Sequence, residues 1–216
     1  MIKIYLIRHG LTETNKEQRF VGWSDVPLAP EGFQQVEKLG SRLAQELAAE
    51  PKVNLYCSDL LRAKQTAEAI GRQIGLAPKA STSLREINFG QWEMLTYNEI
   101  SSRYGEELQF WFADPYHYTP PGGENFTEVS RRFRQGLDKI IKERSGGPLV
   151  IVSHGGAITS FLHYCQDYSL QTEGLWRLRL DNASISLVEK NNDNGDNGLY
   201  KMVFHNDIEH LKEIRT

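Results

Sequence analysis

The chain has 216 residues, of which 39% are hydrophobic and 25% charged, and its formal net charge is −3. This is an ordinary globular composition, with enough chain for one sizeable core or at most two small ones. The 25 Lys and Arg residues against 28 Asp and Glu residues give no excess charge that would draw the chain to nucleic acid or to an anionic membrane. We therefore expect neither as a partner, and any anion that the protein binds has to be held by local groups.

An apolar run opens the chain and is typical of a buried β-strand. It covers Ile2–Ile7, is interrupted by Lys3, and ends at Arg8 and His9. A run this short is neither a signal peptide nor a membrane span, so we expect a cytoplasmic protein. A long loop follows, and after it comes a helical stripe formed by Phe33, Val36, Leu39, Leu43 and Leu47.

Two further β-branched runs predict buried parallel strands at Val53–Cys57 and Leu149–Val152. After the first of them, Ser58 is expected to cap a helix that ends near Gly75. The inner side of that helix should carry Leu61, Ala67, Ile70 and Ile74. Another helix precedes the last run, with four apolar residues in register: Val129, Phe133, Leu137 and Ile140.

The alternation of strands and helices predicts the architecture. It implies a mostly parallel central sheet with helices on both faces, which is a three-layer α/β/α sandwich. No internal repeat and no linker rich in Pro, Gly or Ser divides the chain, so residues 1–216 are expected to form a single domain. Two alternating segments near the end, Ala183–Val188 and Leu199–Phe204, predict a hairpin whose tip is Asn191–Gly198.

The middle of the chain, Thr96–Phe126, is rich in aromatic residues and proline. It is either a packed insertion or a helical lid over the functional site. We favour a lid, with approximate bounds of 94–126, because the segment leads into the flexible pair Gly122 and Gly123.

Cationic side chains gather where the predicted strands end. Arg8 and His9 follow the first strand, Arg62 lies in the first turn of the helix after the second, and His154 follows the third. Ligands of open α/β sheets bind at the carboxyl ends of the strands, so these side chains would form a pocket for a compact dianion such as phosphate. Any one of them alone is more simply a polar loop residue. Four together favour an anion site, because like charges buried side by side are unfavourable without a counter-charge.

The segment LIRHGLTETN, residues 6–15, resembles the signature of the histidine phosphatase superfamily, also called the phosphoglycerate mutase-like family. Five further blocks are similar to the family's pattern and follow the family's order across nearly the whole chain. They are RFVGWSDVPLAPEG at 19–32, CSDLLRAKQTAEAI at 57–70, LREINFGQWE at 84–93, PPGGENF at 120–126 and IVSHGGAI at 151–158.

The resemblance implies a role for each of the clustered side chains. His9 would be the nucleophile that attacks phosphorus and forms a phosphohistidine. Arg8, Arg62 and His154 would hold the equatorial phosphate oxygens, where transition-state charge is spread. Further substrate-binding positions would be Asn15, Gly22 and Gly155.

The resemblance also identifies Glu86 as the general acid for the leaving alkoxide and then as the base toward water. Without the family pattern, Glu86 could equally be a surface carboxylate paired with its neighbour Arg85. The scheme requires no metal and no cofactor, and the sequence lacks the clustered Asp, His and Asn ligands of metallophosphatases. Three other histidines are expected on helix or tail surfaces: His163, His205 and His210.

Departures from the family pattern favour a phosphatase over a mutase. In the segment where mutases resemble RFTGW, Val21 replaces the threonine. Phe112 and Ala113 follow Trp111 at the positions where mutases carry paired arginines after a tryptophan. A mutase must hold a second phosphate, so the absence of these groups argues against one. We expect a metal-independent phosphomonoesterase for small phosphorylated metabolites. The alternatives are a mutase dependent on 2,3-bisphosphoglycerate and, in a different class, a non-catalytic module that binds a phosphorylated ligand.

Two details point to the α-ribazole phosphatase branch, with α-ribazole 5'-phosphate as the candidate substrate. They are Met94, where most relatives have Gly, and the block PPGGENF. The segments DNASISLV and HNDIEHLKEI are equally similar to phosphoserine phosphatases, which stay an alternative. A homodimer through an edge strand is compatible with the family. Six aromatic residues could face an uncharged organic body or belong to the core: Trp92, Tyr97, Tyr104, Trp111, Phe112 and Tyr116.

Overall fold

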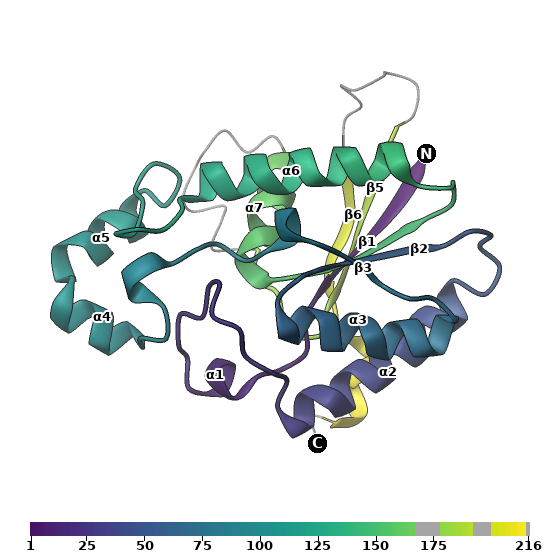
Figure 1. The fold of residues 1–216 in the computed structure, drawn as a ribbon, viewed down its shortest axis with the longest axis horizontal. Helices are drawn as coiled ribbons and strands as arrows, with labels where there is room; N and C mark the ends of the chain where they lie inside the picture. The colour runs from purple at the N-terminus through teal and green to yellow at the C-terminus, as the bar shows by residue number, and fades with distance from the viewer. Residues whose placement is uncertain (167–177, 192–199, 215–216) are drawn as a thin grey trace.

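A six-stranded sheet forms the centre of the part of the chain that the computed structural model describes, residues 1–166, 178–191 and 200–214 (Figure 1). The strand order is β3-β2-β4-β1-β5-β6. The first four strands in chain order pair in parallel, and β5 runs antiparallel to both β1 and β6. The strands are β1 (Ile2–Arg8), β2 (Asn54–Ser58), β3 (Lys79–Ser81), β4 (Leu149–Ser153), β5 (Ile185–Lys190) and β6 (Tyr200–Asp207).

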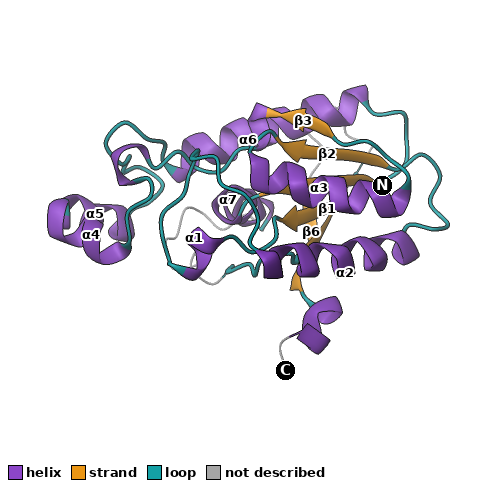
Figure 2. Ribbon diagram, turned by 60° about the horizontal axis from the view of Figure 1, so that its bottom comes forward, coloured by secondary structure: helices purple, strands orange, loops and turns teal. Residues whose placement is uncertain are grey.

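Helices cover both faces of the sheet, with α2 and α3 on one side and α6 and α7 on the other (Figures 1 and 2). The predicted three-layer α/β/α sandwich is therefore confirmed. The α-helices of the described residues are α1 (Glu13–Lys16), α2 (Pro30–Glu46), α3 (Leu61–Ile74), α4 (Tyr97–Arg103), α5 (Gly105–Ala113), α6 (Phe126–Glu143) and α7 (Gly155–Cys165). Short 3-10 turns are η1 (Thr82–Leu84), η2 (Gly90–Trp92) and η4 (Glu209–Ile214).

Alternate residues of the strands pack into two separate hydrophobic cores, one on each face of the sheet. Along β1, Ile4 and Leu6 pack with α6 and α7, whereas Tyr5 and Ile7 pack with α2 and α3. Because successive side chains point to opposite faces, a strand buried on both faces is a continuous apolar run, which is why β1, β2 and β4 could be predicted. The short strand β3 was not predicted, since its sequence Lys-Ala-Ser has no apolar run.

The predicted hairpin corresponds to β5 and β6, which pair from Ile185 with Asp207 to Lys190 with Tyr200. The antiparallel pair extends the parallel sheet on the β1 side. Beyond Asn191, its predicted tip lies outside the described residues.

Two residues that the helical stripes place inward are exposed instead. Phe33 of α2 is 41% exposed and Leu61 of α3 is 36% exposed. In the first turn of α2 the inward position belongs to Gly32, where a Cβ would lie 2.1 Å from the Leu11 carbonyl oxygen. In α3, Leu61 precedes the inward Ala67 by six residues, which is roughly 240° around the helix, so its side chain faces away from the sheet.

The N-terminus of α3 is capped from a distant loop and not by Ser58. The N-cap residue is Leu60, which has no side chain that can cap. Instead, Asp25 Oδ1 accepts a hydrogen bond from the Leu61 amide at 2.6 Å, while Ser58 Oγ accepts one from the Leu60 amide at 3.3 Å. The predicted end at Gly75 is confirmed, because this residue caps the helix with a left-handed φ of 71°.

The segment predicted as a lid carries α4 and α5, which lie beyond one end of the sheet (Figures 1 and 2). Three of its aromatic residues belong to the core, since Trp111, Tyr116 and Phe126 are at most 4% exposed. The Trp111 ring packs edge to face against the rings of Phe20 and Phe89, at centroid distances of 6.0 and 6.1 Å. The segment is therefore anchored through buried aromatic side chains, and its exposed aromatic residues are Tyr97, Phe110 and Phe112.

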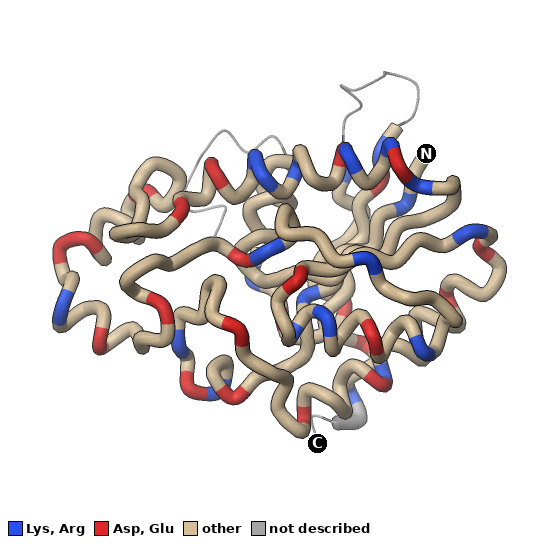
Figure 3. Tube along the Cα trace, viewed as in Figure 1, with Lys and Arg blue, Asp and Glu red and all other residues tan. Residues whose placement is uncertain are grey.

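Charges of both signs are interspersed over the described chain. Figure 3 shows Lys and Arg positions mixed with Asp and Glu positions along helices and loops. Within the described residues, no helix has the length and apolar character needed to cross a bilayer. An anion site has to be created by local contacts.

The two faces of α2 predict a contrast in stability. Leu39 is fully buried, so Leu39→Ala should lower the free energy of unfolding by about 2–5 kcal/mol through lost burial and a cavity. Phe33→Ala removes a larger but partly exposed side chain and should cost less than about 1.5 kcal/mol. Urea unfolding of both variants measures the difference, and an equal or larger cost for Phe33→Ala would contradict the assignment of the faces.

Candidate functional site

The residues that follow the strands meet at one edge of the sheet. His9 follows β1, His154 follows β4, and their ring centroids are 5.2 Å apart. Arg62, in the first turn of α3, donates from Nε to His9 Nε2 at 3.2 Å. The exposed fractions of the three side chains are 3% for His9, 0% for His154 and 2% for Arg62, so the cluster is almost completely removed from solvent.

Among the described residues, backbone carbonyls fix two guanidinium groups, and no carboxylate forms an ion pair with either. Arg62 donates to Ser24 O at 2.9 Å and to Gly22 O at 2.8 Å. Arg8 donates to Leu180 O. Burial lowers the pKa of Arg62 to about 10 and lowers that of Arg8 as well, so both remain cations at neutral pH. A carbonyl orients a guanidinium without neutralising it, which leaves the positive charge available to an anion.

The surroundings of His9 favour the neutral imidazole with its lone pair on Nε2. Its Nδ1 lies 2.7 Å from Gly10 O, and since a carbonyl can only accept, Nδ1 carries the proton. Nε2 is then the acceptor from Arg62. Burial, followed by the charges of Arg62 and Arg8, lowers the pKa of His9 well below its usual value. A neutral Nε2 between two cations is the form that can attack an electrophile.

His154 is the second buried imidazole, and its pKa is also lowered well below its usual value, by burial and then by Arg62. Neither of its ring nitrogens has a hydrogen-bond partner among the described residues, and the same holds for Arg8 Nε. Gly155 lies against Arg8, since a Cβ there would be 3.3 Å from Arg8 Nε. Buried polar groups are costly unless satisfied, and the oxygens of a phosphate dianion could accept from Arg8 Nε and from the one N–H of the neutral His154 ring.

A cavity of about 470 Å³ opens beside this cluster, and Arg8, His9, Arg62 and Glu86 are among the residues that line it. Its apolar lining comes from Leu11, Phe20, Val21 and Phe89, and its remaining lining is mostly polar: Asn15, Gln18, Arg19, Arg179, Asp181 and Asn182. Apart from Phe20 and Phe89, the lining contains no aromatic side chain from the described residues. Of the aromatic residues expected of the lid, Trp111 contacts the cavity lining indirectly, by packing against Phe20 and Phe89.

The described residues lining the cavity include Asn15 but neither Gly22 nor Gly155. Asn15 Oδ1 accepts hydrogen bonds from Thr12 N at 3.2 Å and Asn182 Nδ2 at 3.0 Å, so the amide nitrogen of Asn15 is the group that can donate to a ligand. Gly22 contacts the site indirectly, because its carbonyl oxygen accepts a hydrogen bond from Arg62. Gly155 instead begins α7 beside Arg8.

Glu86 lies at the cavity with its carboxylate on the N-terminus of α7. Its two oxygens accept hydrogen bonds from Gly156 N at 3.1 Å, Ala157 N at 2.8 Å and Ile87 N at 3.0 Å. The alternative pairing with Arg85 is wrong, because Arg85 forms a bidentate ion pair with Asp59 at 2.8 and 2.6 Å. The helix N-terminus orients the Glu86 carboxyl group beside the cluster.

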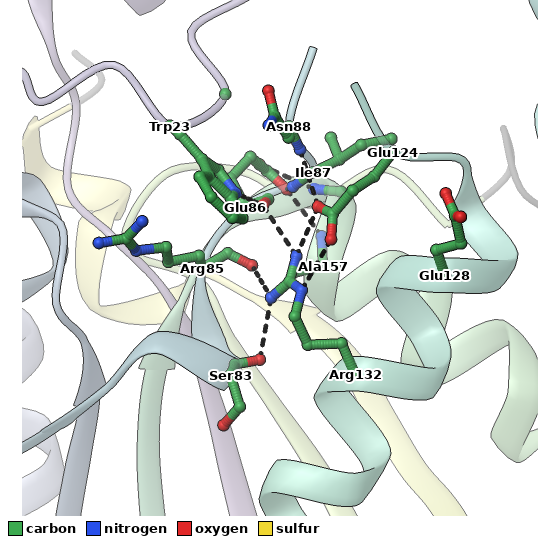
Figure 4. A network of polar contacts seen from close by, with 12 residues as sticks. Trp23, Ser83, Arg85, Glu86, Ile87, Asn88, Glu124, Glu128, Arg132 and Ala157 are labelled. Carbon is green, nitrogen blue, oxygen red and sulfur yellow. Dashed lines mark hydrogen bonds and ion pairs between the residues drawn. The ribbon is translucent and has the colours of Figure 1, made fainter. Parts of the chain in front are cut away.

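Residues that the sequence did not single out hold the backbone of Glu86 (Figure 4). Arg132 Nη2 and Trp23 Nε1 both donate to Glu86 O, at 3.0 and 2.8 Å. Glu124 in turn forms an ion pair with Arg132 at 2.9 Å. In the sequence, Arg132 resembles the other arginines of its helix, so no local signal distinguishes it.

The histidines outside the cluster differ partly from expectation. His205 is exposed, but the expected surface position of His163 is wrong, because His163 is 2% exposed and its Nδ1 forms a hydrogen bond with Tyr116 OH. His210 is half-buried and lies 3.0 Å from Ala183 O through Nε2. Among the described residues, no three His, Cys, Asp or Glu side chains lie close enough to hold a metal ion.

Comparison with known proteins establishes the family. Residues 4–201 match the sequence profile of the histidine phosphatase superfamily, branch 1. This match covers most of the chain, and the chain belongs to that superfamily. The motif blocks that resembled the family therefore lie on the family's fold, with their basic residues at the carboxyl edge of the sheet.

Curated relatives carry different names. The chain is 36% identical over 187 residues to the bifunctional protein Rv2228c of Mycobacterium tuberculosis, which is 87% of this chain but 50% of the relative, so the chain spans about half the length of that protein. It is 34% identical over 193 residues to the probable phosphoglycerate mutase GpmB of Klebsiella pneumoniae, covering 88% of this chain and 85% of the relative.

Two solved structures illustrate the fold. YhfR of Bacillus stearothermophilus superposes with a TM-score of 0.86 at 28% identity, covering 98% of this chain and 100% of that one. The α-ribazole phosphatase of Shigella flexneri superposes with a TM-score of 0.78 at 25% identity, covering 96% and 97%.

The electrostatics predict that both clustered histidines are neutral at pH 6.5, where a histidine in solution is half protonated. Imidazole nitrogen chemical shifts measured by NMR across pH test this, and inorganic phosphate should raise the pKa of both rings by supplying a counter-charge. Because the unfolded chain then binds more protons than the folded one, the free energy of unfolding should decrease as pH falls below about 6.5. Protonated rings at pH 6.5 without phosphate would contradict this description.

Proposed function

We propose that the chain is a phosphomonoesterase that works through a phosphohistidine on His9 and needs no metal ion. The observation that carries the proposal is the buried His9 imidazole, whose Nε2 accepts from Arg62 and which lines an open cavity together with Arg8 and Arg62. Such an arrangement combines a nucleophile with fixed positive charge, which is what transfer of a dianionic phosphoryl group requires.

In the first step, His9 Nε2 attacks phosphorus in line with the ester oxygen. The P–N bond forms as the P–O bond breaks, and the proton of Glu86 passes to the departing alkoxide. Arg8, Arg62 and His154 bind the equatorial oxygens, and the Asn15 amide donates a further hydrogen bond. The contact from His9 Nδ1 to a carbonyl keeps the ring oriented and stabilises the positive charge that it gains.

In the second step, water attacks the phosphohistidine. The Glu86 carboxylate takes a proton from the water, a new P–O bond forms, and the P–N bond breaks. Inorganic phosphate leaves, His9 returns to its neutral form, and Glu86 is protonated again. The Glu86 carboxyl group thus serves both steps. Its position in the cavity lining, together with His9, supports this double role.

A small ester with an uncharged organic body fits the cavity best. The cavity volume of about 470 Å³ is that of a small-molecule site, and Phe20, Val21 and Phe89 offer apolar surface to the leaving group. The α-ribazole ester has such a body, and the fold similarity to the Shigella flexneri α-ribazole phosphatase supports it as the candidate substrate. Phosphoserine stays an alternative.

A phosphoglycerate mutase is the second candidate, since the relative GpmB bears that name. A mutase has to grip a second anionic group at the cavity. Outside the cluster, the described lining contains two basic residues, Arg19 and the exposed Arg179. Arg19 is already paired with Glu17 at 2.5 Å and Glu99 at 3.3 Å, which leaves Arg179 as the candidate partner of a second anion. The phosphatase is favoured, because it needs no second anion site.

His9→Ala is expected to reduce hydrolysis of p-nitrophenyl phosphate on the order of 10³-fold or more, because it removes the proposed acceptor of the phosphoryl group. His205→Ala, at an exposed position on β6, is the matched control and should retain activity. Wild-type turnover should persist in EDTA. Full activity of His9→Ala, loss of turnover in EDTA, or no phosphate release by the wild type would each overturn the proposal.

A substrate panel separates the candidates. We expect kcat/KM to be higher for α-ribazole 5'-phosphate than for phosphoserine or 3-phosphoglycerate, and Phe89→Ala to reduce this preference by about 10-fold through lost apolar contact. Incubation of 3-phosphoglycerate with 2,3-bisphosphoglycerate should release free phosphate. Faster formation of 2-phosphoglycerate would establish the mutase instead.

A further inference from the structure

The backbone around Glu86 is held by one side chain of helix α6 (Figure 4). Arg132 Nη1 donates to Ser83 O and Arg85 O, and Arg132 Nη2 donates to Glu86 O, each at 3.0 Å. Three carbonyls within four residues thus converge on one guanidinium. Its planar fork has the geometry for this, whereas a lysine ammonium lacks the same fixed directions.

Glu124 fixes the guanidinium from its other side. Its carboxylate accepts from Arg132 Nε at 3.0 Å and from Nη2 at 2.9 Å. The same carboxylate accepts from Asn88 N at 3.0 Å, and Glu124 N donates to Asn88 O at 2.8 Å. The Glu124–Arg132 pair therefore spans the segment before and after Glu86, and its two side chains are only 19% and 21% exposed.

The carboxyl group and the carbonyl of Glu86 are consequently held from two different helices. The carboxylate rests on the Gly156 and Ala157 amides of α7, while the carbonyl accepts from Arg132 of α6 and from Trp23. A side chain restrained at both ends has little freedom to leave its position. Proton transfer needs this restraint, because small displacements of a catalytic group cost large factors in rate.

The pair also joins the α4–α5 segment to Glu86. Glu124 lies at the end of that segment, and the backbone before it packs closely on the loop after Glu86: Gln91 N donates to Pro121 O at 2.9 Å. At Gly90, whose φ is 55°, a Cβ would lie 2.2 Å from Pro121 O. The position of the segment's end and the position of Glu86 are therefore mechanically linked.

We propose that Arg132 and Glu124 form a positioning pair that holds Glu86 in place to protonate the leaving group. This inference rests on the proposed function. Arg132 and Glu124 are not among the described residues lining the cavity, so they act through Glu86 and not on the substrate. Their removal should slow only the reactions that need the proton.

The leaving group provides the test. An alkoxide needs a proton to depart, whereas 2,4-dinitrophenolate leaves without one. Arg132→Lys and Glu124→Gln should each lower kcat/KM for the preferred alkyl phosphate about 10- to 100-fold, within the range for general acid catalysis, and by less than about 3-fold for 2,4-dinitrophenyl phosphate. kcat/KM is the appropriate constant, because it reports only the steps up to formation of the phosphoenzyme. The matched control is Arg131→Lys, an exposed arginine one residue away on α6, which should change neither value.

A double-mutant cycle with Glu86→Gln completes the experiment. If Arg132 acts through Glu86, Arg132→Lys in the Glu86→Gln background should change kcat/KM for the alkyl phosphate by less than about 2-fold. Equal losses with both esters, or an undiminished loss in that background, would overturn the inference. Thermal unfolding shows whether each variant is folded at the assay temperature, and Glu124→Gln, which preserves the side-chain shape, tests the pair if Arg132→Lys unfolds. A wild type that hydrolyses neither ester would instead refute the proposed function and the inference with it.

Discussion

The burial of two cations beside one imidazole is the constraint on which the site depends. Arg62 is 2% exposed, Arg8 is partly buried, and both lie next to His9. Among the described residues, backbone carbonyls and His9 Nε2 accept their hydrogen bonds. Burial, followed by the like charges of Arg62 and Arg8, lowers the pKa of His9, because desolvated like charges are unfavourable. A bound dianion would offset these charges, so the same electrostatics favour an anionic ligand and the unprotonated His9 ring.

The side chains of the cationic cluster come from separate secondary-structure elements. Two parallel strands deliver Arg8, His9 and His154 to the same edge, and the first turn of α3 delivers Arg62. The loop that caps α3 through Asp25 also supplies the carbonyls that orient Arg62. Sheet, helix terminus and loop therefore each contribute to the fixed charge around the His9 imidazole, although the chain as a whole carries a formal net charge of −3.

Features marked by a local sequence pattern could be predicted, whereas contacts between residues far apart in the sequence could not. Strands β1 and β4 and the histidine after each could be predicted because continuous apolar runs mark them locally. Long-range contacts could not. Arg132 meets carbonyls nearly fifty residues away, and nothing in its helical pattern distinguishes it from Arg131. The same holds for the aromatic side chains at the cavity, where Phe20 and Phe89 take the place expected of the lid, because only the folded chain decides which rings face inward.

The most direct test of the central claim is chemical trapping of the intermediate. The protein is mixed with a phosphate ester labelled in its phosphoryl group, quenched within milliseconds in alkaline denaturant, and digested for peptide mapping. The account predicts a label that is stable to alkali, labile to acid and located on His9, and that is lost in His9→Ala. Turnover of the ester without any protein-bound label, or a label on another residue, would contradict it.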